Sequence, residues 1–180
     1  SGFGIHSYLA NENEIYGNDL SYNSDLSLFI DGTGNTSIHN NTFVGNEDNP
    51  VKITSSYYNV IRDNNFVEND DYLLFYNAGA FNRLVNNVFK ESGILLEDSS
   101  NQILENNLIT DASDMNGIKI YKTSSNNYLS GNTIIDSDDE DIFVGGSGNQ
   151  INNRGYNNQF TTIKVQNNGQ LILMDYISVR

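Results

Sequence analysis

Several residue types are absent or scarce in this chain of 180 residues, and each absence excludes a class of protein. Cysteine is missing, which excludes disulfides and thiolate metal sites. Proline occurs once, at Pro50, and histidine twice, at His6 and His39. No stretch approaches the 18 or more apolar residues of a membrane span, so we expect no membrane insertion.

Positive charge is also scarce. Nine Lys and Arg stand against 23 Asp and Glu, which gives a net charge of −14. A phosphate-binding surface needs clustered Lys and Arg, so nucleic acid is excluded as a partner. Attraction to anionic lipid is disfavoured for the same reason. An acidic surface suits a protein that stays soluble or that binds cations.

Asparagine is abundant, and its positions repeat. The chain contains 31 Asn, many of them three residues after one apolar residue and two before another. The first four members of this series lie 23 residues apart, and the later gaps are 19 and 26. A period in this range indicates a stacked-repeat architecture. The six triplets are Ile15/Asn18/Leu20, Ile38/Asn41/Phe43, Ile61/Asn64/Phe66, Leu84/Asn87/Phe89, Ile103/Asn106/Leu108 and Leu129/Asn132/Ile134.

Short alternating segments surround these Asn. Val51-Lys52-Ile53 and Ile118-Lys119-Ile120 alternate with a period of two, which is typical of strands, and no window predicts an amphipathic helix. Two or three short strands per repeat, with Asn-rich corners, predict an all-β protein. We expect a right-handed parallel β-helix of about seven rungs over residues 1–158, roughly 30–35 Å long.

The recurring Asn have a structural explanation in such a fold. An Asn at the same corner of every rung can turn inward, where its amide offers two donors and an acceptor to neighbouring rungs. Asn also tolerates the bent backbone of a corner. We therefore predict a ladder of stacked amides, with no catalytic role, formed by Asn18, Asn41, Asn64, Asn87, Asn106 and Asn132.

The regularity ends near Arg154. Thr161-Thr162-Ile163-Lys164-Val165 alternates, Asn167-Asn168-Gly169 is a turn signal, and an apolar segment follows. We expect residues 159–180 to form a hairpin that caps the core, or the start of a further β-domain. The chain begins at Ser1 rather than Met and ends on a strand-like segment, 176–180, so we expect it to be a piece of a longer protein.

Two repeats carry a resemblance to a known family. Asn59-Val60-Ile61-Arg62-Asp63-Asn64-Asn65-Phe66 and its counterpart at 101–108 resemble the parallel β-helix repeat of the pectin-lyase-like superfamily. The similarity is to the carbohydrate-binding and sugar-hydrolase-type repeats of NosD-like periplasmic proteins and of large surface proteins. It covers about residues 3–158. It implies the fold, but the superfamily includes lyases, hydrolases, epimerases, adhesins and spacers.

No catalytic constellation of that superfamily is found in the sequence, so a non-enzymatic function is favoured. A hydrolase would need two or three acids at a set separation on one face. The Tyr-Gly-x-Asp-Pro-His-type run of the epimerase-like enzymes has no match, because Pro50 is not followed by His. His6 and His39 fall in adjacent rungs and lack a third metal ligand.

The acids gather between the third strand of one rung and the first strand of the next. Hard oxygen ligands at such density are suited to Ca²⁺, the one cofactor that the sequence suggests; neither function considered below requires a cofactor. The alternative is a solvated, repulsive edge that keeps the rod soluble. The candidate Ca²⁺ ligands are Asp136, Asp138, Asp139, Glu140 and Asp141.

Aromatic residues suggest a second kind of site. Several of the 11 Tyr lie next to inward positions and should face outward, Tyr76 among them. Exposed aromatic faces stack on sugar rings, although Tyr also covers cross-strand neighbours on plain sheet surfaces. The candidates for sugar stacking are Tyr57, Tyr58, Tyr72 and Tyr121.

Two functions remain open. The first is a structural or adhesive module of an extracellular or cell-surface protein, a spacer or scaffold that pairs end to end with neighbouring subunits through exposed strand edges. The second is a carbohydrate-binding or polysaccharide-active module, with or without Ca²⁺. A NosD-like role in metal-centre maturation is weaker, because the chain lacks Cys and has few His and Met for copper.

Overall fold

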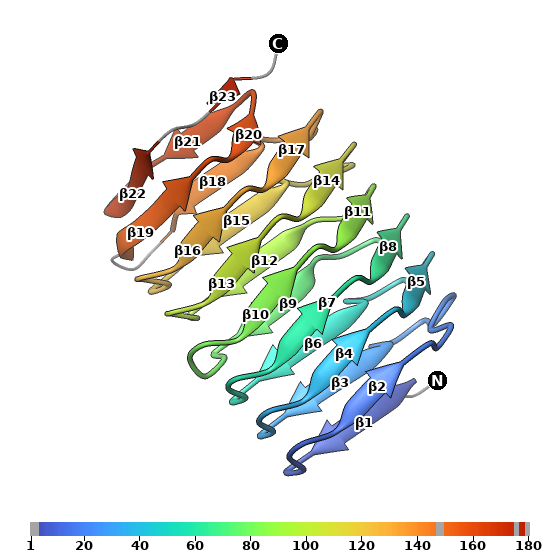
Figure 1. Ribbon diagram of the computed structural model, residues 1–180. Coiled ribbons are helices and arrows are strands. Elements are labelled where there is room, and N and C mark those ends of the chain that lie inside the picture. Colours follow the sequence, from blue (N-terminus) through green and yellow to red (C-terminus); the bar gives the residue numbers. More distant parts are fainter. Residues whose placement is uncertain (1–3, 147–149, 175–176, 179–180) are drawn as a thin grey trace.

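The chain folds into short strands that belong to three parallel sheets, in a computed structural model that describes residues 4–146, 150–174 and 177–178 (Figure 1). The first sheet contains β1 (Ile5–Tyr8), β3 (Leu28–Asp31), β6 (Val51–Thr54), β9 (Leu73–Tyr76), β12 (Ile94–Glu97), β15 (Ile118–Tyr121), β18 (Ile142–Gly145) and β21 (Ile163–Val165). The second contains β2 (Glu14–Tyr16), β4 (Ser37–His39), β7 (Val60–Arg62), β10 (Arg83–Val85), β13 (Ile103–Glu105), β16 (Tyr128–Ser130), β19 (Gln150–Tyr156) and β22 (Gly169–Met174). The third contains β5 (Thr42–Val44), β8 (Asn65–Val67), β11 (Val88–Lys90), β14 (Leu108–Thr110), β17 (Thr133–Ile135), β20 (Gln159–Phe160) and β23 (Ile177–Ser178).

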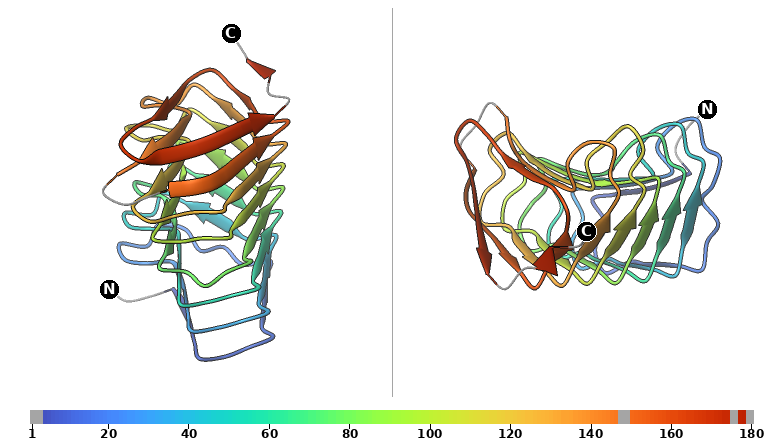
Figure 2. Two further views of the ribbon diagram at one scale, coloured as in Figure 1. Left: turned by 90° about the vertical axis from the view of Figure 1, so that its left-hand side faces the viewer. Right: turned by 90° about the horizontal axis from the view of Figure 1, so that it is seen from above.

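Each turn of the chain contributes one strand to each sheet in most of the stack, and equivalent strands of successive turns pair side by side. Figure 2 shows the turns stacked along one axis. The predicted all-β parallel β-helix of about seven turns is thereby confirmed. Within the described ranges, no helix is long and apolar enough to cross a membrane.

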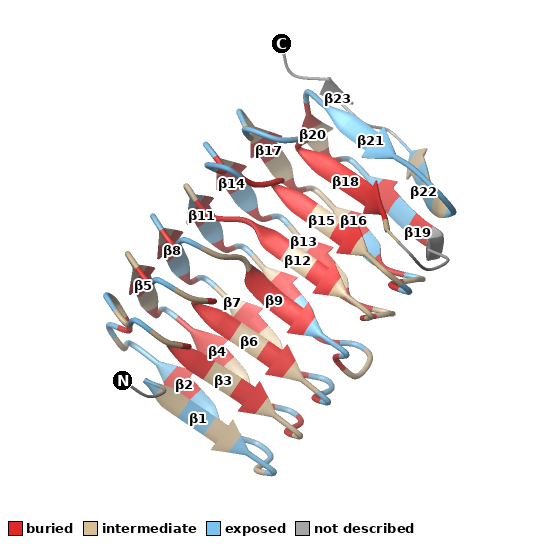
Figure 3. Cartoon of the chain, turned by 180° about the vertical axis from the view of Figure 1, so that it is seen from behind, coloured by how far each residue is buried: buried red, intermediate tan, exposed pale blue. Residues whose placement is uncertain are grey.

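The core is a set of apolar columns. In most strands buried residues alternate with more exposed ones, as the colours of Figure 3 show. Parallel pairing places apolar residues of successive turns next to one another. Phe43, Phe66 and Phe89 pair in register, and their rings stack at centroid distances of 4.8 and 4.6 Å. Because one turn alone cannot enclose its inward side chains, this stacking supplies the core.

The amide ladder forms as predicted in the first four turns, at Asn18, Asn41, Asn64 and Asn87. The Oδ1 of Asn41 accepts from the backbone N–H of Asn18 at 3.0 Å, and Asn64 and Asn87 repeat this contact with the turn before. Each amide also donates across the stack, as Asn64 Nδ2 does to the carbonyl of Ile38 at 3.0 Å. The ladder therefore satisfies backbone donors that the corners would otherwise leave buried without partners.

The fifth ladder position was predicted wrongly. Asn107, not Asn106, accepts from the Asn87 backbone N–H at 3.0 Å and donates to Asn132 Oδ1 at 2.9 Å. Asn106 is exposed and has a positive φ of 53°. Accordingly, Leu104 and Ile109 are the buried core residues of this turn, because a one-residue shift moves every side chain of a strand to the opposite face.

The C-terminal hairpin was also predicted wrongly. β21 pairs in parallel with β18, and β22 pairs in parallel with β19, so the two strands extend existing sheets. β23 likewise pairs in parallel with β20. The residues from 163 onward thus add another turn, because the sheet edges of the previous turn offer a ready template. Of the strand-like segment 176–180, residues 176, 179 and 180 lie outside the described part.

Candidate functional site

Three exposed aromatic residues meet at the corner between the first and second sheets. Tyr57, Tyr58 and Phe81, here named the aromatic corner, have exposed fractions of 45, 53 and 47%. The rings of Tyr58 and Phe81 stack at a centroid distance of 5.5 Å with 17° between their planes. Tyr57 meets Tyr58 edge to face at 5.8 Å. The two stacked rings come from successive turns, so the group spans more than one turn.

The backbone at this corner is unusual for bulky residues. Tyr58 has a φ of 58° and Phe81 a φ of 64°, both in the left-handed region. Each stands immediately before a buried amide, Asn59 or Asn82, and Asn59 donates its backbone N–H to Asn82 Oδ1 at 3.0 Å. Asn59 and Asn82 belong to a second column of stacked amides, separate from the ladder, and this column fixes the conformation of the corner. A left-handed non-glycine residue costs roughly 1–2 kcal/mol, and aromatic residues have no means to reduce that cost.

Glycines make room for the third ring. A side-chain carbon added at Gly34 would lie 2.9 Å from the Tyr57 ring, and one added at Gly79 would lie 3.1 Å from Tyr57 Cβ. Tyr57 thus lies against bare backbone in the turns on both sides of its own. This close fit holds the side chain in place at the surface.

Further aromatic side chains lie on the outer face of the first sheet, which adjoins this corner. Tyr76, the last residue of β9, is 40% exposed, and Lys52 Nζ lies 5.4 Å from its ring centroid. Tyr121 is half-buried, and Lys119 Nζ lies 5.4 Å from its ring and 5.5 Å from that of Phe143. Cation–π contacts of this kind hold the lysine side chains along the face of the sheet.

The structure brings together two of the four tyrosines named as sugar-stacking candidates. Tyr57 and Tyr58 are in contact, whereas Tyr121 lies on the first sheet. Sequence reasoning missed Phe81, although a signal exists. Like Tyr58, it directly precedes a buried corner amide, and the same left-handed position is held by Asn35, Asn101 and Asn126 in other turns and by Glu12 in the first.

Tyr72, the fourth candidate, has a structural contact at the corner between the third and first sheets. Its hydroxyl accepts from the backbone N–H of Asn116 at 2.9 Å, two turns away. The ring passes over Gly93, where an added side-chain carbon would lie 3.0 Å from it. Burial raises the pKa of Tyr72 to about 12.

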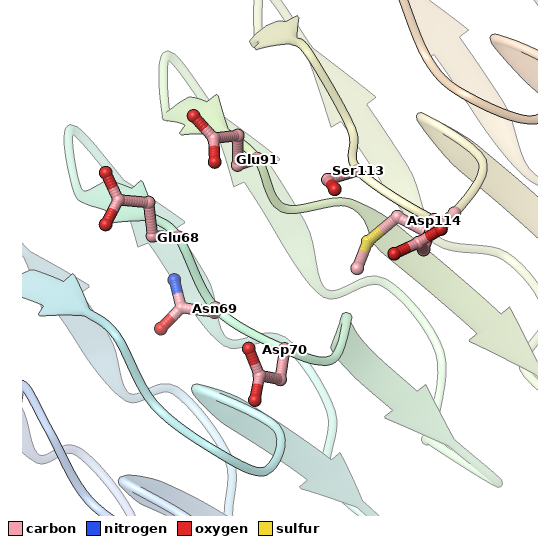
Figure 4. Close-up of a pocket in the computed structure, with 7 residues that line it drawn as sticks. Glu68, Asn69, Asp70, Glu91, Ser113 and Asp114 are labelled. Atoms are coloured by element: carbon pink, nitrogen blue, oxygen red, sulfur yellow. The ribbon is translucent and has the colours of Figure 1, made fainter.

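The Tyr72–Asn116 hydrogen bond spans the turn in which the connection between the third and first sheets is short. Only residues 91–93 join β11 to β12, whereas 68–72 and 111–117 make the same connection in the turns before and after. The shortfall leaves an open hollow of about 430 Å³ lined by Glu68, Asn69, Asp70, Glu91, Ser113, Asp114 and Met115. Figure 4 shows that its carboxylates come from three turns and do not point at a common centre.

Three of the five acids proposed as Ca²⁺ ligands, Asp138, Glu140 and Asp141, are engaged in separate internal contacts. Asp141 is buried, and its Oδ2 accepts from the backbone N–H groups of Thr161 and Thr162 at 2.7 and 3.0 Å. Asp138 accepts from the backbone N–H of Asp114 at 2.9 Å. Asp136 is exposed with a φ of 57°, and Asp139 is also exposed.

Glu140 is bound in a different way. Its Oε1 lies 3.0 Å from Lys164 Nζ, and this hydrogen bond lowers the pKa of the carboxyl group. Its other oxygen accepts from Asn116 Nδ2 at 3.2 Å. Across the described ranges, no group of three or more His, Cys, Asp or Glu is placed to hold a metal ion.

Three parallel sheets wound around one core, with stacked amides at their corners, define a parallel β-helix protein. The family described as "Right handed beta helix region" matches residues 1–93, and that described as "Periplasmic copper-binding protein (NosD)" matches residues 49–173. Each match covers more than half of the chain, so the chain belongs to the right-handed β-helix and NosD families. No curated protein matches the chain in sequence.

Solved structures support the same fold. A double mutant of the periplasmic alginate epimerase AlgG superposes with a TM-score of 0.80 at 14% identity, over 99% of this chain and 48% of that one. A single mutant of the same enzyme gives 0.57 at 13% identity, over 98 and 48%. The chain therefore spans about half the length of these structures. At this identity the likeness concerns the fold alone.

The residues present do not fit the copper of the NosD family name. His6 lies on the first sheet and His39 on the second, and His39 Nε2 lies 2.9 Å from Glu14 Oε1. The His39 ring is buried against Tyr16 at a centroid distance of 5.3 Å. Of the two Met, Met115 is packed in the core. The soft and imidazole ligands that copper prefers are therefore not gathered at one place in the described part of the chain.

Proposed function

We propose that the chain is a non-catalytic module that binds polysaccharide at the aromatic corner, in a periplasmic or extracellular setting. The setting is supported by the word periplasmic in the NosD family description and in the name of the structural neighbour. The ligand class is supported by that neighbour's substrate, alginate, which is a polysaccharide. The family description and the neighbour's name support the setting and the ligand class, and the geometry of the aromatic corner is the main support for binding.

One observation carries the proposal: Tyr58 and Phe81 occupy left-handed positions that Asn occupies in other turns. Bulky residues at such positions are uncommon, and local strain of this kind concentrates at functional sites. Here the strained residues are also exposed and stacked on each other. A surface that served only as a spacer would gain nothing from aromatic residues over Asn at these two places.

The chemistry of the corner suits sugar rings. A pyranose has apolar C–H faces and a polar edge, so it packs against aromatic faces as apolar surface does. Tyr57 and Tyr58 add hydroxyl groups at the rim, which can donate to and accept from sugar hydroxyls. We propose binding without catalysis, because no catalytic constellation was identified in the sequence and three of the five clustered acids are taken up in internal hydrogen bonds and an ion pair.

The test replaces Tyr58 and Phe81 with Asn, the residue that other turns carry there. The double variant should lose binding in affinity electrophoresis against alginate, polygalacturonate and hydroxyethyl cellulose. Two stacked rings contribute about 1–3 kcal/mol, so we expect roughly 5- to 150-fold weaker binding. Stability should change by no more than about 1 kcal/mol, because relief of the left-handed strain offsets the lost ring contact.

Tyr22→Asn is the matched control, because Tyr22 is also exposed, with a φ of 57°, but lies between the third and first sheets. It should bind as the unmodified chain does. If the unmodified chain binds none of the polysaccharides, or the double variant binds equally well, the proposal is wrong and a spacer or scaffold role is favoured.

A further inference from the structure

A continuous column of outward residues runs along the middle of the first sheet. Strand pairing places them in register from turn to turn, so consecutive members are about 4.8 Å apart. In order they are His6, Phe29, Lys52, Leu74, Leu95, Lys119, Phe143 and Lys164. The column combines aromatic, aliphatic and cationic side chains, with no acid among them.

The lysines of this column are unusual in so acidic a protein. The ion pairs of the described residues use Arg62, Arg83, Lys90, Lys122 and Lys164. Lys52 and Lys119 take part in none of these pairs and instead lie over the rings of Tyr76 and Tyr121. Asp71 is close enough to Lys52 for a coulombic interaction, but neither Lys52 nor Lys119 is held in one of these ion pairs, so both charges can act on a ligand.

Between the two lysines the column itself is apolar, although Leu74 is only 9% exposed and Leu95 is half-buried. Leu74 and Leu95 separate them in the column, which puts Lys52 and Lys119 three strands, or about 14 Å, apart. Tyr76 and Tyr121 flank this floor on the neighbouring column, with Glu97, which is paired with Lys122, between them. Tyr76 leads directly into the turn that carries Phe81. The floor is therefore continuous with the aromatic corner.

We infer that this face of the first sheet binds an acidic polysaccharide, with Lys52 and Lys119 contacting its carboxylate or sulfate groups. The inference rests on the proposed function and specifies its ligand class. A polysaccharide chain presents apolar ring faces to Leu95 and to the rings of Tyr76 and Tyr121, and its acidic groups to the lysines. An anionic lipid surface fits less well, because the net charge of −14 would repel a broad negative plane.

The test compares polygalacturonate with its fully methyl-esterified form, which has the same rings without the charge. The intact chain should bind the acid form more tightly, and added salt should reduce the difference. The variant with both Lys52→Met and Lys119→Met should bind the two forms alike, which means roughly tenfold weaker binding of the acid form. Replacing both with Arg should preserve the preference, because Arg keeps the charge.

Lys90→Met is the control, because Lys90 is exposed on the third sheet and paired with Glu91. It should leave both affinities unchanged. Equal binding of the two forms by the intact chain, or an unchanged preference in the double Met variant, would overturn the inference while leaving the proposed function intact. Binding of neither form would overturn the inference, and it would contradict the proposed function as well only if alginate and hydroxyethyl cellulose were also not bound. Tighter binding to phosphatidylglycerol vesicles than to polygalacturonate would assign the lysines to a lipid surface instead.

Discussion

Replacing Asn107 tests the register of the fifth turn and the energetic weight of the amide ladder. The side chain takes part in four hydrogen bonds. Its Oδ1 accepts from Asn87 N at 3.0 Å and from Asn87 Nδ2 at 3.1 Å. Its Nδ2 donates to the Leu84 carbonyl and to Asn132 Oδ1, both at 2.9 Å. Asn107→Ala would remove all four and leave the Asn87 backbone N–H buried without that partner.

The expected loss follows from these contacts. A net contribution of roughly 0.5–1.5 kcal/mol for each hydrogen bond gives a decrease in the free energy of unfolding of about 4 kcal/mol. That is a large fraction of the roughly 5–15 kcal/mol that stabilises an ordinary domain. Denaturant unfolding followed by circular dichroism would measure it, with an unchanged m-value as the sign that both proteins unfold from similar states.

Asn106→Gly is the matched control. Asn106 is exposed, and glycine adopts its φ of 53° without strain. We expect a change within about 1 kcal/mol, since no buried hydrogen bond of the ladder depends on this side chain. A greater loss from Asn106→Gly than from Asn107→Ala would show that the ladder runs through Asn106 and would refute the register described above.

Three other predictions concern stability. Phe66→Ala, between Phe43 and Phe89 in the ring stack, should lower the free energy of unfolding by about 3–5 kcal/mol, and a loss below about 1 kcal/mol would contradict a packed column. Tyr72→Phe removes the acceptor for the Asn116 N–H and should cost about 1–2 kcal/mol near neutral pH. The pKa of Tyr72 is raised from 10.0 to about 12, so the stabilisation that its neutral hydroxyl provides is present below pH 10 and is lost as the pH rises toward 12. The free energy of unfolding, measured from pH 10 to pH 12, should therefore decline less steeply in the Phe variant than in the unmodified chain. The pKa of Glu140 is lowered by Lys164, so this pair stabilises the fold above the carboxyl's ordinary pKa of 4.5 and ceases to do so as the pH falls through the lowered value. Lys164→Met should flatten the acid limb of the stability profile, and an unchanged limb would show that the pair contributes nothing.

The repeat was readable because it is local and one-dimensional. Six apolar and Asn positions at similar spacing are sufficient to predict stacked turns, since each turn must bury its inward side chains against the next. The same triplets contain Phe43, Phe66 and Phe89, which stack as one buried column in the structure. The acidic residues and tyrosines were identified as candidates, but which of them lie together depends on turn lengths that sequence periodicity does not fix.

The sequence by itself determined the fold class and most of the ladder, because period-two alternation and recurring Asn act within each turn. Only the tertiary structure decided the register of the fifth turn. In that turn the sequence allows two registers, because each key position is followed by a residue of the same type: Asn106-Asn107, Ile103-Leu104 and Leu108-Ile109. Pairing with the turns on both sides selects the register in which Asn107 points inward. Stacking also decided that Tyr58 meets Phe81 and that Lys52 and Lys119 share a face, because residues more than twenty positions apart become neighbours only when the turns pack.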